Sequence, residues 1–182
     1  MRALLASVPF LFLLVPTLAA TVILPADFRE IVSGSEVIVH GRVIDVRSAW
    51  VEGRSRIDSF VTVESATFYR GDRSPTITFR TPGGEAGRYK HVMVGAPEFR
   101  LGDEVVLFLR AQQDGVTQIF GLNQGLFRVR VDARTGRRVV IRQLLIADPV
   151  QTKRVVRGAR DRRPLTLDAF AAEIRAAVGA AR

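Results

Sequence analysis

The sequence contains no cysteine. Disulfides, thiol catalysis, iron–sulfur clusters and cysteine-ligated zinc are therefore excluded, because each of them needs a cysteine sulfur. A folded form of the chain depends on its apolar core instead. With 182 residues and a hydrophobic content of 47%, the chain is long enough for one domain with a sizeable core.

Residue patterns that mark catalytic or metal sites are also scarce. The chain has only two histidines, His40 and His91, whereas a zinc site usually needs three or four ligands. No G-x-S-x-G elbow, P-loop, G-x-G-x-x-G fingerprint or calcium loop is present. We therefore expect a protein that is not an enzyme and that has no cofactor and no metal site. Both histidines are expected to be surface or hydrogen-bonded strand residues.

Long apolar runs are limited to one, at residues 3–15. A basic residue precedes it, and a proline followed by small residues comes after it, which is the three-part layout of a signal peptide. The run is shorter than the roughly 20 apolar residues of a membrane-spanning helix. We expect cleavage near Ala19 or Ala20, a periplasmic or secreted protein, and no transmembrane segment in the mature chain. The alternative is an uncleaved N-terminal anchor.

The rest of the chain shows mostly strand patterns. Gly41 interrupts the first strand and indicates a bulge or sharp bend. Simple alternation places Val39 and Val43 on one face of that strand, with Ile44 and Val46 on the other. The strand at residues 104–110 is apolar on both faces, which predicts a central position. Strands are expected at residues 36–49, 57–69, 76–80, 89–94, 104–110, 117–121, 126–131 and 139–146.

Two helices complete the expected elements. A short helix is predicted near residues 25–32, and a longer one begins after Thr166, a plausible N-cap. The fold class that follows is mainly β, with an OB-like antiparallel β-barrel, a short N-terminal helix and a C-terminal helix. The expected division is signal peptide 1–20, β-barrel domain 21–150, basic linker 151–164 and C-terminal helix 165–182.

Positive charge is concentrated in the last third of the chain. The formal net charge is +9, and residues 1–122 carry 13 basic and 13 acidic residues, so the whole excess lies in residues 123–182. Such a region is a candidate for binding anionic polymer or lipid headgroups. Nucleic acid is not expected, because of the export signal and because aromatic residues for base stacking are absent from the basic stretch. The candidate anion-binding residues are Lys153, Arg154, Arg157, Arg160, Arg162 and Arg163.

Two glycine-rich loops are candidate binding sites, because loops held by a rigid scaffold often carry function. The first, at residues 81–89, offers Glu85, Arg88 and Tyr89 beside Gly83 and Gly84. The second, at residues 120–125, offers Asn123 and Gln124. The alternative for both loops is a turn in which glycine only provides a positive φ.

Three segments, at residues 35–43, 61–71 and 101–109, read SEVIVHGRV, VTVESATFYRG and LGDEVVLFL. In order and spacing they resemble the netrin-like domain of the tissue metalloproteinase inhibitors and its bacterial relatives. The chain is also similar to uncharacterised exported bacterial proteins of that layout. The resemblance implies an OB-type five-stranded barrel with packed helices. Those inhibitors chelate a protease zinc through an N-terminal cysteine, which is lacking here, so the resemblance assigns no functional residue.

The sequence thus favours an exported, non-catalytic binding or interaction module of unknown ligand. One alternative is a periplasmic hydrolase with a site near the Gly83-Gly84 loop. Another is an envelope adaptor that binds anionic polymer or lipid through the basic C-terminal third. The expected partner is an envelope protein or an anionic polymer, and the oligomeric state stays open.

Overall fold

The computed structural model describes residues 25–71, 73–111, 115–142 and 164–180. The predicted signal peptide, most of the basic linker and all six candidate anion-binding residues lie outside these ranges. The described elements are α1 (Phe28–Ser33), β1 (Val37–Val51), β2 (Arg56–Arg70), β3 (Thr76–Pro82), β4 (Gly84–Ala86), β5 (Tyr89–His91), β6 (Glu104–Ala111), β7 (Thr117–Ile119), β8 (Leu126–Val131), β9 (Arg138–Arg142), β10 (Leu165–Thr166) and α2 (Leu167–Ala180).

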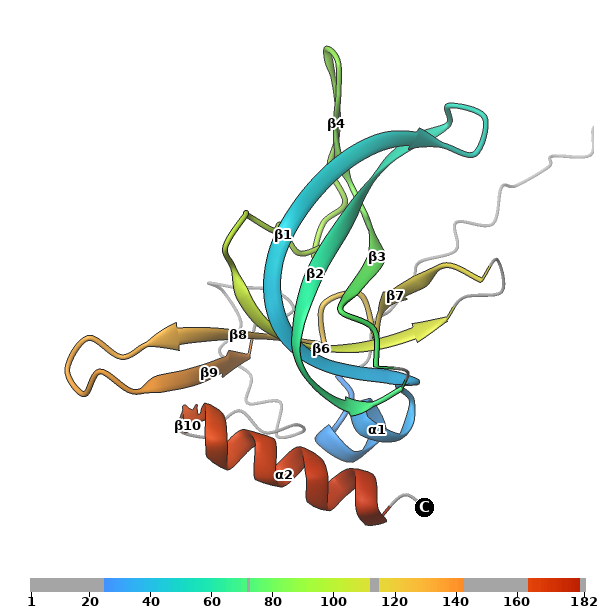
Figure 1. Ribbon diagram of the computed structural model, residues 1–182. Coiled ribbons are helices and arrows are strands. Elements are labelled where there is room, and N and C mark those ends of the chain that lie inside the picture. The colour runs from blue at the N-terminus through green and yellow to red at the C-terminus, as the bar shows by residue number, and fades with distance from the viewer. Residues whose placement is uncertain (1–24, 72, 112–114, 143–163, 181–182) are drawn as a thin grey trace, which may run out of the picture.

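The fold is mainly β, with a large mixed sheet and a helix near each end of the described chain (Figure 1). The sheet has the order β1-β2-β3-β7-β6-β8-β9-β10, and β1 also pairs with β6. Hydrogen-bonded pairings therefore lead from β1 through β2, β3, β7 and β6 back to β1. The expectation of a purely antiparallel sheet is wrong at one place, because β3 and β7 pair in parallel at Arg80 and Gln118.

The long strand β1 reaches two neighbours because it bends. Its first half pairs with β6, while nearly its whole length pairs with β2. The register with β2 shifts between His40 and Gly41, as the glycine predicted. The register also shifts between Ile38 and Val39, and a further unexpected shift lies between Val43 and Asp45. It leaves Ile44 45% exposed and brings Val46 against the same apolar cluster as Val43, so the predicted face of Val46 is wrong.

Apolar side chains form two clusters that share β6. The first lies between the sheet and the two helices and includes Phe108, Phe127, Phe170 and Ile174. The second is made mainly by β1, β2, β3 and β6, and includes Val61 and other strand residues. Residues 105–109 of β6 are completely buried and contribute alternately to the two clusters. The predicted central position of this strand is thereby confirmed.

The two helices begin with side-chain caps. In α1, Asp27 and Glu30 form a capping box, with side-chain to backbone distances of 2.9 and 2.8 Å. In α2, the Thr166 hydroxyl accepts a hydrogen bond from Ala169 N at 3.3 Å, which confirms the predicted N-cap. Among the described residues, no helix has the length and apolar composition that crossing a membrane requires.

Candidate ligand-binding site

A cavity of about 340 Å³ lies where the ends of β1, β2 and β3 meet the β4–β5 hairpin and the segment after β5. We call it the hydroxyl pocket, because Ser48, Ser59 and Thr81 contribute side chains to its lining. Its remaining lining residues are Val46, Val61, Pro82, Gly83, Gly84, Glu85, Lys90, His91, Val92, Met93, Ala96, Pro97, Glu98 and Phe99.

Two of the three hydroxyl groups bond to each other. Ser59 Oγ donates to the carbonyl oxygen of Gly83 at 2.7 Å, so the 3.0 Å bond between Ser48 and Ser59 is donated by Ser48. Gly84 packs directly over this pair, since a Cβ at that position would lie 2.4 Å from Ser48 Oγ. The φ of Gly84 is 149°, a value that L-residues rarely adopt. The lack of a side chain at Gly84 therefore allows β4 to lie directly against the Ser48–Ser59 pair.

The third hydroxyl group is unpaired. The side chain of Thr81 is buried, and its Oγ1 makes no hydrogen bond within the described part of the chain. A buried polar atom without a partner costs about 1–3 kcal/mol. Thr81 lines the pocket although Oγ1 itself is covered, so a small movement of its neighbours would let a polar group of a ligand reach Oγ1 and remove that cost.

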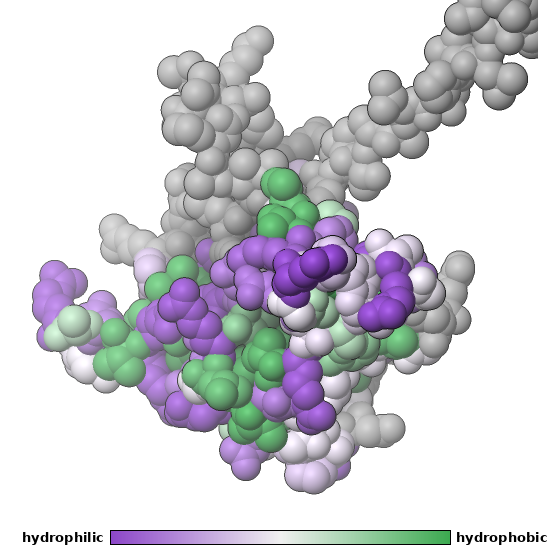
Figure 2. Space-filling view, turned by 90° about the horizontal axis from the view of Figure 1, so that it is seen from above, coloured by the Kyte–Doolittle hydropathy of each residue, from purple (hydrophilic) through white to green (hydrophobic). Residues whose placement is uncertain are grey.

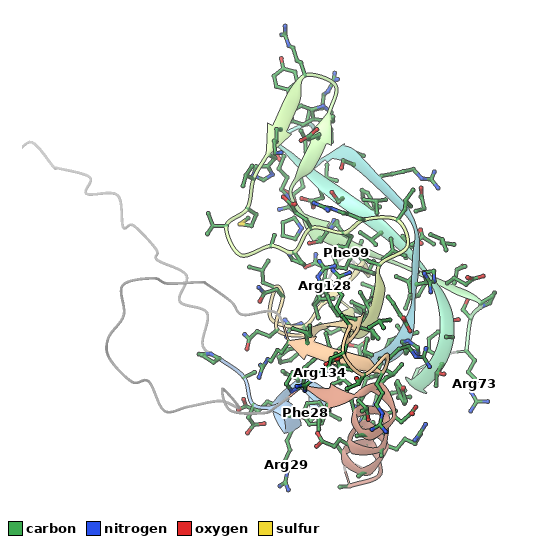
Figure 3. The ribbon with its side chains drawn as sticks, turned by 90° about the vertical axis from the view of Figure 1, so that its left-hand side faces the viewer. Phe28, Arg29, Arg73, Phe99, Arg128 and Arg134 are labelled. Carbon is green, nitrogen blue, oxygen red and sulfur yellow. The ribbon has the colours of Figure 1, made fainter. Side chains whose placement is uncertain are left out.

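The rim of the hydroxyl pocket has an apolar part and a charged pair. Val92, Met93 and Val94 follow β5 with exposed fractions of 68%, 43% and 82%, and the first two line the pocket. Figure 3 shows this segment looping out from the hairpin, with Phe99 at its far end. The charged pair at the rim, Glu85 and Lys90, is joined at 2.8 Å. That bond lowers the pKa of Glu85 and raises the pKa of Lys90, so each charge is matched by its neighbour.

The first predicted loop forms the β4–β5 hairpin. Glu85 lines the pocket, whereas Arg88 and Tyr89 extend beyond it. The Arg88 guanidinium lies over the Tyr89 ring at 5.1 Å and donates to its hydroxyl at 2.9 Å. The Tyr89 ring also meets Trp50 edge-on, with 5.5 Å between ring centroids. The structure thus brings one of the three predicted residues to the pocket and places the other two on the hairpin.

The second predicted loop lies beside a neighbouring cavity of about 380 Å³, which shares Thr81 and Pro82 with the hydroxyl pocket. Gln124 lines that cavity, and its Oε1 accepts a hydrogen bond from Ala26 N at 2.6 Å. Asn123 is buried, and its Oδ1 has no hydrogen-bond partner in the described residues. The cavities beside the two loops therefore meet at the end of β3, which the sequence did not indicate.

Both histidines make hydrogen bonds. His40 Nε2 lies 2.9 Å from Glu104 Oε1, and Arg138 contacts the same carboxylate oxygen at 3.1 Å. His91 Nδ1 lies 3.1 Å from the carbonyl oxygen of Ile57. His91 lines the hydroxyl pocket, but in the described ranges it makes no hydrogen bond to a serine or a carboxylate. No group of three potential metal-ligating side chains occurs there either.

Sequence reasoning missed the pocket's own hydroxyl groups and its apolar rim. Ser48 turns inward because of the bulge at Ile44 in β1, so simple alternation misplaces it. The sequence signal that could have revealed the rim is the short apolar run Val92-Met93-Val94, which lies between breaker residues and is therefore expected in an exposed loop. Comparison of the chain with protein-family models, curated proteins and solved structures finds no match.

Proposed function

We propose that this protein is an exported, non-catalytic binding module that takes an apolar segment of a partner protein into the hydroxyl pocket. The observation that carries the proposal is the run of three exposed apolar residues, Val92, Met93 and Val94, at the rim of the pocket. Contiguous exposed apolar surface is typical of interaction sites. A pocket with apolar walls and a few polar groups is typical of a binding site.

The unpaired Thr81 hydroxyl supports a ligand that carries both apolar and hydrogen-bonding groups. A polypeptide segment has both, because its side chains suit the rim and its backbone amides suit Thr81 Oγ1 and the other hydroxyls. The pocket volume of about 340 Å³ is at the small end of ligand sites. We therefore infer that one or two side chains of the partner enter it.

The hydrolase alternative has less support. A serine nucleophile needs a base within hydrogen-bond reach, and His91 bonds to a backbone carbonyl instead. The hydroxyls of Ser48 and Ser59 are directed to each other and to Gly83. The side chains present suit binding better than nucleophilic attack.

The scaffold proposed for this module is an OB-type barrel, related to netrin-like domains. Its support is the set of pairings that leads from β1 through β2, β3, β7 and β6 back to β1, with one parallel pairing between β3 and β7. Export is supported by the layout of residues 1–20. A module in that compartment meets envelope proteins, which are the partners proposed here.

The first test is retention of partners from the cell's own envelope extract on the immobilised protein. We expect a protein that is retained by the wild type and lost with the double variant Val92→Ser, Val94→Ser. The matched control is Ile44→Ser, which also removes an exposed apolar side chain but lies away from the pocket. Equal retention of every partner by the double variant would refute the proposed site.

A second readout uses Met93, since the chain has two methionines and the other is Met1. Methyl-labelled methionine gives one NMR signal at the pocket rim, and it is the only one once a signal peptide is removed. The purified partner is expected to shift this signal in the wild type and in Ile44→Ser. An unshifted Met93 signal in the presence of bound partner would place the interaction elsewhere.

The variant Thr81→Val separates stability from binding. Valine has nearly the shape of threonine but lacks the unpaired hydroxyl, so the free energy of unfolding should rise by about 1–2 kcal/mol. Partner binding should weaken at the same time, because the hydrogen bond from the ligand is lost. Denaturant unfolding and partner titration measure the two effects. A variant that is less stable than wild type would show that the hydroxyl has a partner in the unbound protein.

A further inference from the structure

The hairpin formed by β8 and β9 is unusually rich in arginine. Residues 126–142 contain six basic side chains and one acidic side chain, Asp132. Figure 1 shows this hairpin projecting sideways from the body of the molecule, past the start of α2. The basic side chains are Arg128, Arg130, Arg134, Arg137, Arg138 and Arg142.

Two of these arginines are engaged inside the fold. Arg128 bonds to Asp103 at 2.6 Å and stacks over the Phe99 ring, which Figure 3 shows beside it. Arg142 donates to the carbonyl oxygen of Ala26 at 3.1 Å. The other four are exposed, and we call this part of the molecule the arginine hairpin: Arg130, Arg134, Arg137 and Arg138. Of these, Arg130 lies 3.9 Å from Asp103 and Arg138 lies 3.1 Å from Glu104, so the turn residues Arg134 and Arg137 are the two whose charge is available.

The acidic side chain within the hairpin, Asp132, does not neutralise the turn arginines Arg134 and Arg137. Asp132 accepts hydrogen bonds from the backbone N–H groups of Arg134 and Thr135, both at 2.9 Å. Its carboxylate is therefore used to close the turn. Arg134 and Arg137 take part in the hydrogen bonds of this turn only through backbone atoms, so their guanidinium groups are available to solvent.

Apolar side chains are exposed on the same hairpin. Val131 is 65% exposed and pairs with Arg138 across the strands, and Ile141 is 45% exposed. In Figure 2, hydrophobic and hydrophilic side chains stand side by side at this end of the molecule. Guanidinium groups next to exposed apolar side chains match a surface that has phosphates above a hydrocarbon layer.

We propose that the arginine hairpin docks the protein onto a phospholipid bilayer with anionic headgroups. The guanidinium groups bind headgroup phosphates, and Val131 enters the boundary between headgroups and acyl chains. A soluble acidic polymer would use the same charges but would leave Val131 in water, so the apolar side chain favours the bilayer. This surface is separate from the hydroxyl pocket, whose lining contains none of its residues.

The test compares two double variants of the full-length chain that remove the same charge. Arg134→Gln, Arg137→Gln changes the hairpin, whereas Arg29→Gln, Arg73→Gln changes exposed arginines elsewhere, as Figure 3 shows. Both retain residues 143–163, so any binding through the basic linker is common to them. Binding is measured by sedimentation with vesicles of phosphatidylcholine alone or with about 30–40% phosphatidylglycerol, which gives the surface a negative potential.

The hairpin variant is expected to bind the anionic vesicles at least about tenfold more weakly than wild type. The control variant should change by about twofold or less, and added salt should weaken wild-type binding because it screens the attraction. Unchanged thermal unfolding of both variants verifies that they fold. Equal binding by the two double variants would overturn the proposal.

The variant Val131→Ser distinguishes a bilayer from other anions. It should weaken vesicle binding and leave any binding of heparin or inorganic phosphate unchanged. If Val131→Ser binds vesicles as wild type does, or if heparin binds more tightly than the vesicles, a soluble anion is the ligand and the bilayer proposal fails.

Discussion

At the residue scale, Gly41 has the clearest structural role. A Cβ at this position would lie 2.2 Å from the carbonyl oxygen of Glu64 and 2.6 Å from Val63 Cγ1. The first contact is with backbone, which cannot move aside without breaking the pairing of β1 and β2. The close approach occurs at the bulge that lets β1 reach both β2 and β6.

Gly41→Ala is therefore expected to lower the free energy of unfolding by about 3 kcal/mol, as overpacking does. The control is Gly179→Ala in α2, where a Cβ would meet nothing within 4 Å. That substitution should leave stability unchanged or raise it by up to about 0.5 kcal/mol. Urea unfolding of both variants measures the difference, and equal stabilities would contradict the role assigned to Gly41.

The sequence correctly predicted that the histidines form hydrogen bonds and that β1 has a bulge at Gly41. It did not predict the pocket. The sequence shows that a hydroxyl is present at Ser48, Ser59 and Thr81, while only the tertiary structure shows that two are paired and one is not. The reason is that the partners are far apart in sequence, or absent, so no local pattern reports them. Glu85 was found because it lies in a conspicuous glycine-rich loop.

At the scale of elements, the β8–β9 turn combines several local features. Gly136 has a φ of 66°, a left-handed conformation that suits glycine, and Asp132 accepts two backbone hydrogen bonds. These bonds favour the ionised carboxylate and lower the pKa of Asp132. The turn is thus stabilised by a charge that acid removes.

The pH dependence follows from the direction of this shift. The pKa of Asp132 is lower in the folded protein than in the unfolded chain. Its contribution to the free energy of unfolding is therefore fully present above the unfolded-state pKa, which is about 3.9. It is lost as the pH falls through the lower, folded-state pKa. Asp132→Asn should therefore be less stable than wild type at neutral pH, with a gap that narrows in acid. Denaturant unfolding of both proteins from neutral to acidic pH tests this. A difference in stability that does not change with pH would contradict it.

Most elements themselves follow from local patterns. The strands β1, β2, β6 and β8 lie within two residues of their predicted bounds, because alternation and turn residues are local properties. The short β4 was missed, since its residues read only as a breaker-rich loop. It forms because β5 pairs with it.

At the scale of the whole molecule, the two apolar clusters are joined through β6. The ring of Phe170 in α2 lies 4.8, 5.6 and 6.4 Å from the rings of Phe127, Phe28 and Phe108. Because the same strand supplies residues to the second cluster, we expect the helix and the sheet to unfold together.

Phe170→Ala should lower the free energy of unfolding by about 3–5 kcal/mol, since it leaves a cavity among these rings. Helical circular dichroism and the fluorescence of Trp50, the only tryptophan, should still change in one transition. Ala172→Ser, at an exposed position of α2, is the control and should have little effect. Loss of the helical signal before the Trp50 signal would show that α2 unfolds independently.

The sequence by itself determined the mainly β class, most strands, both helices and the bend at Gly41, because each depends on neighbouring residues. Export, the absence of catalysis and the resemblance to netrin-like domains remain predictions from the sequence. Only the tertiary structure decided the parallel pairing of β3 and β7, the bulge of β1 at Ile44, the unpaired Thr81 hydroxyl and the exposure of Arg134 and Arg137 on the hairpin. These depend on contacts between residues that are distant in the chain, and a single sequence carries no local record of such contacts.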